Sequence, residues 1–404
     1  MKRIYLDHAA AAPVDARVVK AMEPFWQEQY GNPGAIHAEG VFARSAVADA
    51  RKSIATLLGV HADEIVFTGS ATESANLALF GAVRAWQKEH LDKRAHVIVS
   101  AIEHDAVLEP ARRLREEGVR VSEVAVGGDG VVDLAALKEM ICEETVVISI
   151  MYANNEVGTV EPIKEIAKII RKWKKETRGV TRDGKPEGDE RYPLFHTDAC
   201  QAANYCDMNI PRLGVDLMTL NAAKVYGPKG IGLLYRSREV LIEAQIIGGG
   251  HERGLRAGTE NVPAVVGFAC ALTGAREIAE EESVRLSNIR DHAFLELEKI
   301  PGLVINGSKT ARLPNNIHFS IHAVDHEFLA LALDARGFAV ATKSACNEFD
   351  ADTSHVLLAL RNEAAKDLPI SGIRLSLGRS TTKEDIDAFT AALKDILATM
   401  IINI

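Results

Sequence analysis

The chain has 404 residues, 47% of them hydrophobic and 25% charged, and its formal net charge is −9 at pH 7. These values are typical of a globular protein with a substantial core and predict roughly two to three domains. The negative charge argues against direct nucleic-acid binding, because no basic face offsets it. Asp7 and His8 interrupt the apolar residues of the N-terminus, so we expect no signal peptide there. No apolar run approaches membrane-spanning length, and we expect a cytoplasmic protein that does not bind membranes.

The spacing of cysteines and histidines excludes two further classes of protein. The five cysteines are odd in number and contain no close-spaced pair, which indicates reduced thiols rather than a disulfide framework. His318, His322 and His326 are evenly spaced, but they cross a predicted strand-to-helix boundary. We therefore predict no metal site.

From about residue 38 the sequence predicts alternating helices and strands. In chain order the predicted elements are helix 38–58, strand 64–68, helix 72–90, strand 96–100, helix 106–117, strand 119–124, helix 134–143, strand 146–151, helix 163–177, strand 192–197 and strand 215–220. Strands that alternate with helices of this length indicate βαβ units and a largely parallel sheet. Such a sheet binds ligands on the loops at the carboxyl ends of its strands.

The pattern changes after Gly258, where one long helix is predicted from Pro263 toward Leu297 and short strands and helices follow. This change indicates a second domain of α+β type. We assign residues 14–260 to a large α/β domain, and residues 1–13 with 261–404 to a smaller one. The polar segment 179–193, rich in Gly and charge, is interpreted as a surface insertion of the large domain.

Lys224 and Asp198 are the most informative pair of residues. Lys224 lies on a short turn after an apolar strand, in the stretch NAAKVYGPKGIG, and Asp198 ends another strand in HTDACQ. A lysine amine can form a Schiff base with an aldehyde cofactor. A carboxylate can pair with a protonated pyridine nitrogen, and together these two groups provide what pyridoxal 5′-phosphate (PLP) requires. A lysine before a Gly-Pro turn is usually a solvated loop residue, but Asp198 favours the cofactor interpretation.

Four more polar residues follow predicted strands. Thr72 lies at a helix N-terminus in TGSATESAN, where N–H groups can hold a phosphate, although capping alone explains such residues more often. His104 in AIEHDAV either stacks on a pyridine ring and exchanges protons or simply begins a helix. Asn155 and Gln201 can each hydrogen-bond a phenolic oxygen.

Cys346 opens a polar segment after the short strand 338–340. A thiol in polar, exposed surroundings is available as a nucleophile, whereas a buried thiol is usually inert. Arg374 lies on an apolar strand in GIRLSLGR, where a guanidinium is suited to bind a carboxylate with two hydrogen bonds. Asn32 in YGNPGAIH can supply a second polar contact.

Taken together, these motifs resemble the PLP-dependent cysteine desulfurases of the class V aminotransferase family, in particular its NifS/IscS-like branch. The resemblance covers almost the whole chain. It includes YLDHAAAAPVD, YGNPGAIH, SATESANLAL, EHDAV, NNEVGTVEPI, HTDACQ, KVYGPKGIG, GGGHERGLRAGTEN, SAC and IRLSLGRSTTKEDID, in that order. It implies the fold of PLP-dependent transferases (fold type I), with a large α/β domain and a smaller α+β domain.

The resemblance also implies how the cofactor is bound. Lys224 holds PLP as a Schiff base and removes the Cα proton of L-cysteine, while Asp198 keeps the pyridine nitrogen protonated. His104 stacks on the ring, and Asn155 and Gln201 contact its phenolic oxygen. Thr72 binds the phosphate. Thr259 reaches the phosphate from a neighbouring subunit, which implies a homodimer.

For the substrate, the resemblance implies that Asn32 and Arg374 hold the carboxylate of L-cysteine. Cys346 attacks the substrate sulfur, which yields L-alanine and an enzyme persulfide. The persulfide then passes to an iron–sulfur scaffold or a tRNA-thiolation acceptor protein. Segment 346–374 resembles the region that contains the mobile catalytic loop of the family.

The chain departs from the family pattern at the cofactor lysine and at the cysteine. The family usually has Ser-x-His-Lys where this chain has Asn221-Ala222-Ala223-Lys224, so two phosphate contacts change. A hydrogen bond to a charged group contributes about 1.5–3 kcal/mol, and Asn221 is expected to recover part of the loss. Ala341, Thr342 and Lys343 replace the usual Ser-Ser-Gly before Ser-Ala-Cys. The positive charge of Lys343 favours the thiolate form of Cys346.

Two alternatives to a cysteine desulfurase remain open at the level of sequence. One is another class V PLP enzyme, such as an aminotransferase or a selenocysteine lyase, that uses Lys224 on a different substrate. The other is a homologue without catalytic activity that serves as a binding partner in a sulfur pathway, an alternative that rests on Asn221 and Ala223.

Overall fold

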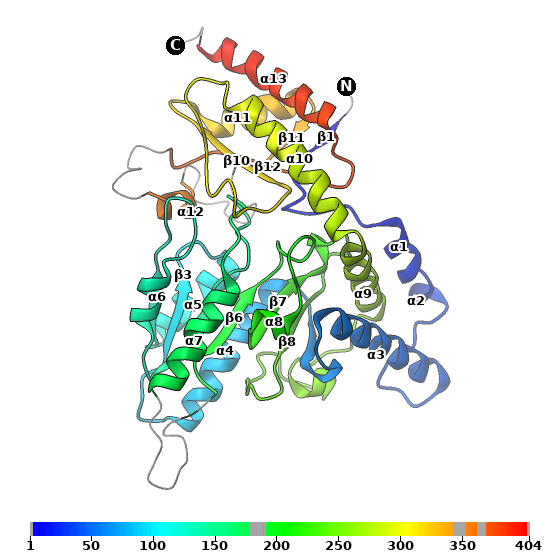
Figure 1. Ribbon diagram of the computed structural model, residues 1–404. Helices are drawn as coiled ribbons and strands as arrows, with labels where there is room; N and C mark the ends of the chain where they lie inside the picture. The colour runs from blue at the N-terminus through cyan, green and yellow to red at the C-terminus, as the bar shows by residue number, and fades with distance from the viewer. Residues whose placement is uncertain (1–2, 178–188, 190, 343–352, 362–368, 402–404) are drawn as a thin grey trace.

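The structure is a computed structural model that describes residues 3–177, 189, 191–342, 353–361 and 369–401. Two bodies of structure stack on one another, and both chain termini lie at the smaller, upper one (Figure 1). Most of segment 179–193 and all of 343–352, including Cys346, lie outside the described residues.

A seven-stranded sheet forms the centre of the larger body. Its strand order is β2 (Ile65–Thr68), β8 (Gly232–Arg236), β7 (Leu217–Asn221), β6 (Leu194–Asp198), β5 (Thr145–Ser149), β3 (His96–Ser100) and β4 (Arg120–Val124). All neighbouring pairs are parallel except those that β8 makes with β2 and β7. The predicted, mostly parallel α/β sheet is therefore confirmed.

Helices cover both faces of this sheet, which explains why strands inside it, such as β3, are buried and largely apolar. In β3, for example, Val97 and Val99 belong to one hydrophobic cluster and Ile98 belongs to another. The first cluster includes side chains of α4 (Ala71–Glu89) and α5 (Asp105–Glu116). The second includes side chains of α3 (Ala38–Leu58), α6 (Leu134–Met140), α7 (Ile163–Thr177) and α9 (Val262–Glu277).

The smaller body contains an antiparallel sheet with the order β12 (Ile373–Ser376), β10 (Asn316–Ile321) and β9 (Leu303–Ile305). β1 (Ile4–Tyr5) pairs in parallel with β11 (Phe338–Ala339), so the N-terminus joins this body. A third hydrophobic cluster packs the three-stranded sheet against α10 (Ala279–Leu297), α11 (His326–Ala335) and α13 (Lys383–Ile401). The shorter elements are α1 (Ala16–Met22), α2 (Pro24–Gln27), α8 (Ile210–Leu213), α12 (His355–Ala359), η1 (Ala62–Glu64), η2 (Ala222–Lys224) and η3 (His251–Gly254).

Most of the predicted elements are present, some with shifted ends. Helices 38–58 and 163–177 and strand 96–100 coincide with α3, α7 and β3. The single long helix from Pro263 toward Leu297 was wrong, because the chain bends by 67° between α9 and α10. α9 packs against α1 and α3, whereas α10 packs in the smaller body, so the bend at Ile278 transfers the chain from one core to the other. The domain limits 14–260 and 261–404 stay predictions. A boundary at Ile278 is favoured, because α9 belongs to the core of the larger body and α10 to that of the smaller one.

Within the described part of the chain, no individual helix has the length and apolar character needed to cross a membrane. Among the residues that the structure describes, the bent pair of α9 and α10, taken together, reaches that length and composition.

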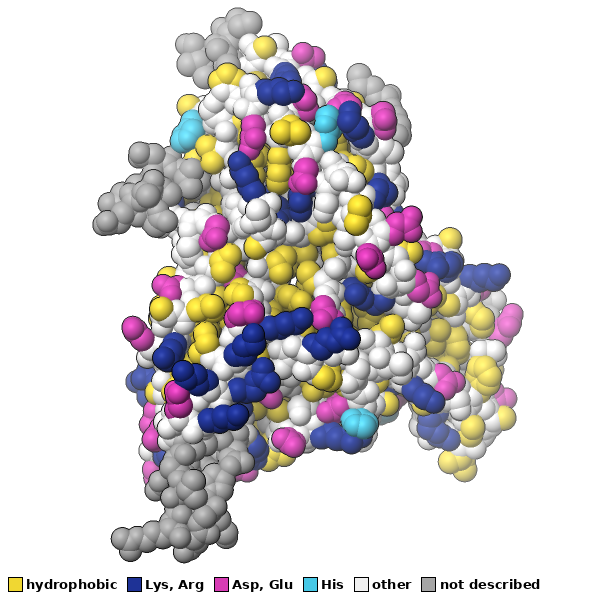
Figure 2. Space-filling view, in the orientation of Figure 1, with side chains coloured by type: hydrophobic (Ala, Val, Ile, Leu, Met, Phe, Trp, Pro, Cys, Tyr) yellow, Lys and Arg dark blue, Asp and Glu magenta, His cyan; other side chains and the backbone are white. Residues whose placement is uncertain are grey.

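The surface carries a basic region that the net charge did not indicate. Figure 2 shows Lys and Arg side chains gathered over α7. The exposed basic residues of this helix are Lys164, Lys168, Arg171, Lys172 and Lys175. The sequence-based expectation that no basic face is present was therefore wrong, because charge clusters on one helix even when the whole chain is acidic.

Glu161, in the loop after β5, contacts the segment at Val132. Its buried carboxyl group provides a test of how these two segments pack. Its carboxyl group is 2% exposed and accepts a hydrogen bond from the Val132 N–H at 2.9 Å. Burial raises the pKa of Glu161 from 4.5 to about 8. Between these two pH values the folded state holds a proton that the unfolded state has lost, so stability falls as pH rises through this window.

We therefore predict that the Glu161→Gln variant loses less stability than the wild type as pH rises from 4.5 to 8. The free energy of unfolding of the variant, relative to the wild type, rises by at most about 1.4 kcal/mol per pH unit. Urea denaturation at several pH values measures this difference. Parallel pH profiles for the two proteins would show that Glu161 ionises normally in the folded state.

Candidate active site

A cavity of about 180 Å³ lies at the carboxyl ends of β3, β5, β6 and β7, beside β12 of the smaller body. This is the edge at which a parallel sheet was expected to bind a ligand. Eight residues singled out in the sequence line this cavity: Thr72, His104, Asn155, Asp198, Gln201, Asn221, Lys224 and Arg374.

Lys224 ends the short helical turn η2 that follows β7. Its Nζ atom donates hydrogen bonds to the carbonyl oxygens of Ala9 at 2.8 Å and Ala10 at 2.6 Å. The Gln201 side-chain amide donates to the same Ala9 oxygen at 3.0 Å. The N-terminal segment thus crosses from the smaller body and forms one wall of the cavity, a role that the sequence analysis did not assign to it.

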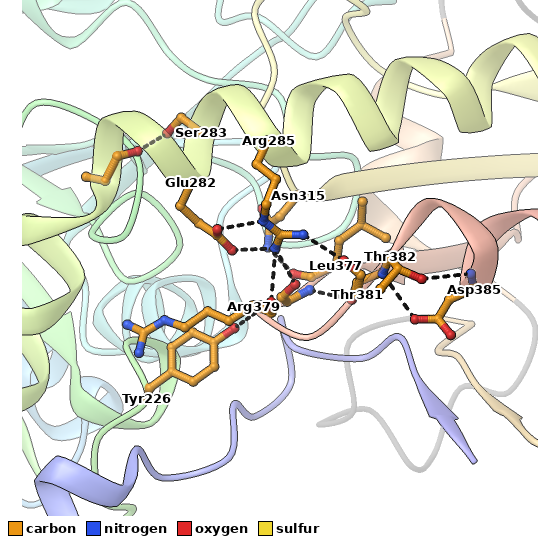
Figure 3. Close-up of polar contacts among 12 residues, drawn as sticks. Tyr226, Glu282, Ser283, Arg285, Asn315, Leu377, Arg379, Thr381, Thr382 and Asp385 are labelled. Carbon is orange, nitrogen blue, oxygen red and sulfur yellow. Dashed lines mark hydrogen bonds and ion pairs between the residues drawn. The ribbon is translucent and has the colours of Figure 1, made fainter. Parts of the chain in front are cut away.

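The turn after Lys224 is held by the C-terminal region (Figure 3). Tyr226 has a positive φ of 62°, which is uncommon for a residue other than glycine. Its hydroxyl accepts a hydrogen bond from the Arg379 N–H at 2.9 Å, and the Arg379 guanidinium lies 3.9 Å from the ring centroid. Arg285 pairs with Glu282 and donates to the carbonyls of Gly378 and Thr381, which fixes the loop that carries Arg379.

Asp198 ends β6, and 7% of its surface is exposed. Its Oδ1 atom accepts a hydrogen bond from the Cys200 N–H at 2.9 Å. Below it, His196 is fully buried between Ser149 and Thr219, and burial lowers the pKa of His196 to about 4. The His196 imidazole is therefore neutral at physiological pH. Asp198 lines the cavity, and the polar side chains behind it, His196, Ser149 and Thr219, are neutral.

His104 begins a helix, one of the two roles that the sequence left open, whereas its stacking on a pyridine ring stays a prediction. It caps α5, because its Nδ1 atom accepts a hydrogen bond from the Ala106 N–H at 3.0 Å. It also lines the cavity. A neutral imidazole whose Nδ1 accepts must carry its hydrogen on Nε2, so the cap fixes the tautomer.

Arg374 is the largest fully buried side chain of the described residues, with 2% exposure. One of its terminal nitrogens donates to the Asn155 carbonyl at 2.9 Å, and the other pairs with Asp7 Oδ1 at 2.8 Å. Its Nε atom is buried and has no hydrogen-bond partner among the residues described. Asp7 and Asn155 therefore orient a guanidinium that retains a donor for a ligand.

Asn32 and Thr259 do not line the cavity of this single chain. Both are exposed, and the Asn32 side chain accepts a hydrogen bond from the Gly34 N–H at 2.9 Å. Cys346, the predicted nucleophile, falls outside the described residues. The roles of all three stay predictions.

Glu103, next to His104, is a buried acid that the sequence analysis passed over. Its Oε1 atom accepts hydrogen bonds from the Ser100 hydroxyl at 2.8 Å and the Met151 N–H at 2.6 Å. Burial raises the pKa of Glu103 well above its usual value and so favours its protonated form. In the sequence, a charged residue shortly after a buried strand could have indicated this buried acid. The neighbouring His104 was interpreted as the functional residue instead.

The cavity fits PLP. The Lys224 amine and the Asp198 carboxyl group face the same space, as attachment to the aldehyde and contact with the pyridine nitrogen require. At one side, Thr72 lies in the first turn of the 19-residue helix α4, whose N-terminus favours a phosphate. Asn221 also lines the cavity, and its side chain caps η2 by accepting from the Ala223 N–H at 3.0 Å.

A family model described as aminotransferase class-V matches residues 4–178 and 189–389. With the sheet, the cavity and its lysine–aspartate pair, this match defines a PLP-dependent enzyme of fold type I. The chain belongs to the class V aminotransferase family.

Within that family, the similar proteins share one description. A cysteine desulfurase IscS of Dictyoglomus turgidum is 40% identical over 399 residues, which cover 98% of this chain and 95% of the relative. A solved structure titled NIFS-like protein has a TM-score of 0.85 and 33% identity, and the match covers 98% of this chain and 100% of that one. The structure of SspA in complex with cysteine has a TM-score of 0.75 and 31% identity, with 92% and 98% coverage.

The environment of the described thiols generates a prediction about their reactivity. Cys200 lines the cavity, but burial and the nearby Asp198 raise the pKa of its thiol well above its usual value. Burial raises the pKa of Cys206 to about 12. Because the thiolate is the reactive form, iodoacetamide at neutral pH is expected to leave both unmodified in the folded protein and to label both in urea. Peptide mass spectrometry measures this, and rapid labelling of folded Cys200 would contradict the assignment.

Proposed function

We propose that this protein is a cysteine desulfurase that converts L-cysteine to L-alanine and transfers the sulfur to its own Cys346. The observation that supports this most strongly is the convergence of Lys224, Asp198 and Arg374 on one cavity, in a chain that matches curated desulfurases over nearly its full length. In the reaction, the substrate Cβ–S bond breaks, a new S–S bond forms to Cys346, and a proton is added at Cβ.

Lys224 and Asp198 are the residues that would hold PLP, with Thr72, His104, Asn155, Gln201 and Asn221 around it. When bound, PLP supplies an electron sink for charge that develops at the substrate Cα. Lys224 takes the Cα proton of the substrate, since its amine enters the cavity where the substrate binds. His104 can move a proton at Nε2, because its Nδ1 is occupied by the helix cap.

Arg374 is proposed to bind the substrate carboxylate. Its two terminal nitrogens are held by Asp7 and the Asn155 carbonyl, so the guanidinium is oriented before the substrate arrives. The buried Nε–H then gains an acceptor. Asn32 stays the predicted second contact, although in the single chain it lies outside the cavity.

The sulfur acceptor within the protein is proposed to be Cys346. Cys200 is the cysteine that lines the cavity among the described residues, and its raised pKa makes it a poor nucleophile. From Cys346, the sulfur is proposed to pass to an acceptor protein, either an iron–sulfur scaffold or a tRNA-thiolation protein. Assembly of iron–sulfur clusters is favoured, because the curated relatives carry the name IscS.

Incubation with L-cysteine tests this function. Wild-type protein is expected to form L-alanine and to carry one extra sulfur on the Cys346 peptide by mass spectrometry. Cys346→Ala is expected to lose at least about a hundredfold in alanine formation, whereas the matched control Cys200→Ala stays within about threefold. Lys224→Ala should form no alanine and no PLP absorbance that borohydride fixes.

Two results would support the alternative functions instead. Full turnover of cysteine by Cys346→Ala would indicate another class V activity, such as a selenocysteine lyase or an aminotransferase. A wild-type protein that binds no PLP would indicate a homologue without catalysis, a possibility that Asn221 and Ala223 first raised.

The protein is further proposed to be a homodimer. Thr259 is exposed and does not line the cavity of its own chain, as expected if it contacts the phosphate of a partner. Large hydrophobic side chains of segment 26–42 are exposed in the single chain, and burial against a second copy would stabilise them. They are Trp26 (61%), Tyr30 (72%), Ile36 (94%), Val41 (43%) and Phe42 (48%).

We predict a mass in solution of twice the 43.8 kDa chain. Thr259→Ala should keep that mass and bind PLP about tenfold more weakly, because one hydrogen bond to a charged phosphate is lost. Sedimentation and PLP titration measure the two quantities. A monomeric wild type that binds PLP fully would exclude the contribution of a second subunit.

A further inference from the structure

The chain on both sides of segment 343–352 is fixed to elements that line the cavity. Before it, Ala341 and Arg374 exchange two main-chain hydrogen bonds, with N–O distances of 3.1 and 2.7 Å. After it, helix α12 contacts the loops that follow β3 and β5. The sequence places Cys346 between these two attachments.

Ser354 makes the first contact of α12. It is 5% exposed, and its hydroxyl donates a hydrogen bond to Glu156 Oε2 at 2.6 Å. The Ser354 hydroxyl oxygen also accepts a hydrogen bond from the Leu357 N–H at 3.1 Å, which caps the helix. Glu156 directly follows the cavity residue Asn155, and its own N–H donates to the Asn154 side chain at 2.8 Å. One hydroxyl therefore both starts α12 and attaches it to a rigid loop of the cavity.

His355 makes the second contact. Its Nε2 atom lies 2.9 Å from the Glu103 carbonyl oxygen, and a carbonyl only accepts, so Nε2 carries the hydrogen. Glu103 is itself fixed by Ser100 and Met151. It directly precedes His104, which lines the cavity. The side-chain contacts of Ser354 and His355 with Glu156 and Glu103 thus each end one residue away from a cavity residue.

Apolar contacts complete the attachment of α12. Side chains of the helix pack with residues that follow β3 and β5, and all of these are at most 3% exposed. They are Val356, Leu357, Leu360, Ile102, Met151 and Val157.

We propose that Ser354 and His355 are positioning residues for sulfur transfer, which hold the downstream end of the segment containing Cys346 on the loops of Asn155 and His104. The inference rests on the proposed desulfurase function. A thiol on a chain attached close to the cavity at both ends has a high local concentration there. Release of α12 moves the downstream attachment point further from Cys346 along the chain, which lowers that concentration and misorients the thiol.

The test compares a reaction that needs Cys346 with one that does not. The double variant Ser354→Ala/His355→Ala is expected to form alanine from L-cysteine about tenfold more slowly. Exchange of the Cα hydrogen of L-alanine with D₂O, followed by NMR, is expected to proceed at the wild-type rate, because it needs Lys224 and PLP but no thiol. His355→Gln keeps an N–H donor and is expected to retain most of the alanine formation.

Asp133→Ala is the matched control. It removes the cap of α6, where Asp133 accepts from the N–H groups of Ala135 and Ala136, far from the cavity lining. Thermal unfolding and PLP absorbance confirm that each variant is folded and loaded. The inference is overturned if the double variant forms alanine at the wild-type rate, or if alanine formation and exchange fall in parallel. A wild type that forms no alanine refutes the proposed function, and this inference with it.

Discussion

The site depends on the pairing of two cationic side chains, Arg374 and Lys224, with groups of the N-terminal segment, which crosses between the two bodies. Arg374 is fully buried, and an unpaired buried charge is strongly destabilising, so Asp7 must lie where it does. Two and three residues further along, the carbonyls of Ala9 and Ala10 accept hydrogen bonds from Lys224. A short segment therefore places both cations in one cavity and fixes the smaller body on the sheet.

The same junction explains why so many contacts around the cavity involve backbone. Lys224 and Gln201 donate to carbonyls of the N-terminal segment, and Arg374 donates to that of Asn155. Backbone acceptors do not titrate, so these contacts survive changes of pH. Just behind the cavity, burial keeps His196 neutral and favours the protonated form of Glu103. A ligand in the cavity thus meets cations and one acid, supported by neutral groups.

Elements with strong local signals were predictable from the sequence. The periodicity of 38–58 and 163–177 defined α3 and α7, and the apolar run at 96–100 defined β3. Lys224 and Asp198 were likewise found because each follows an apolar strand, and parallel strands bring their carboxyl ends to one edge. The bend at Ile278 was missed, because both sides of it are helical and only packing against two different cores separates them.

The sequence by itself determined the alternation of helices and strands, the cofactor lysine with its acid, and the family resemblance, since each depends on local spacing. Only the tertiary structure decided that Asp7 pairs with Arg374 and that Ala9 contacts Lys224, across more than two hundred residues of chain in each case. It also decided that Asn32 and Thr259 lie outside the cavity of one chain. Local patterns fix which side chains follow a strand, whereas the packing of distant segments decides which of them meet.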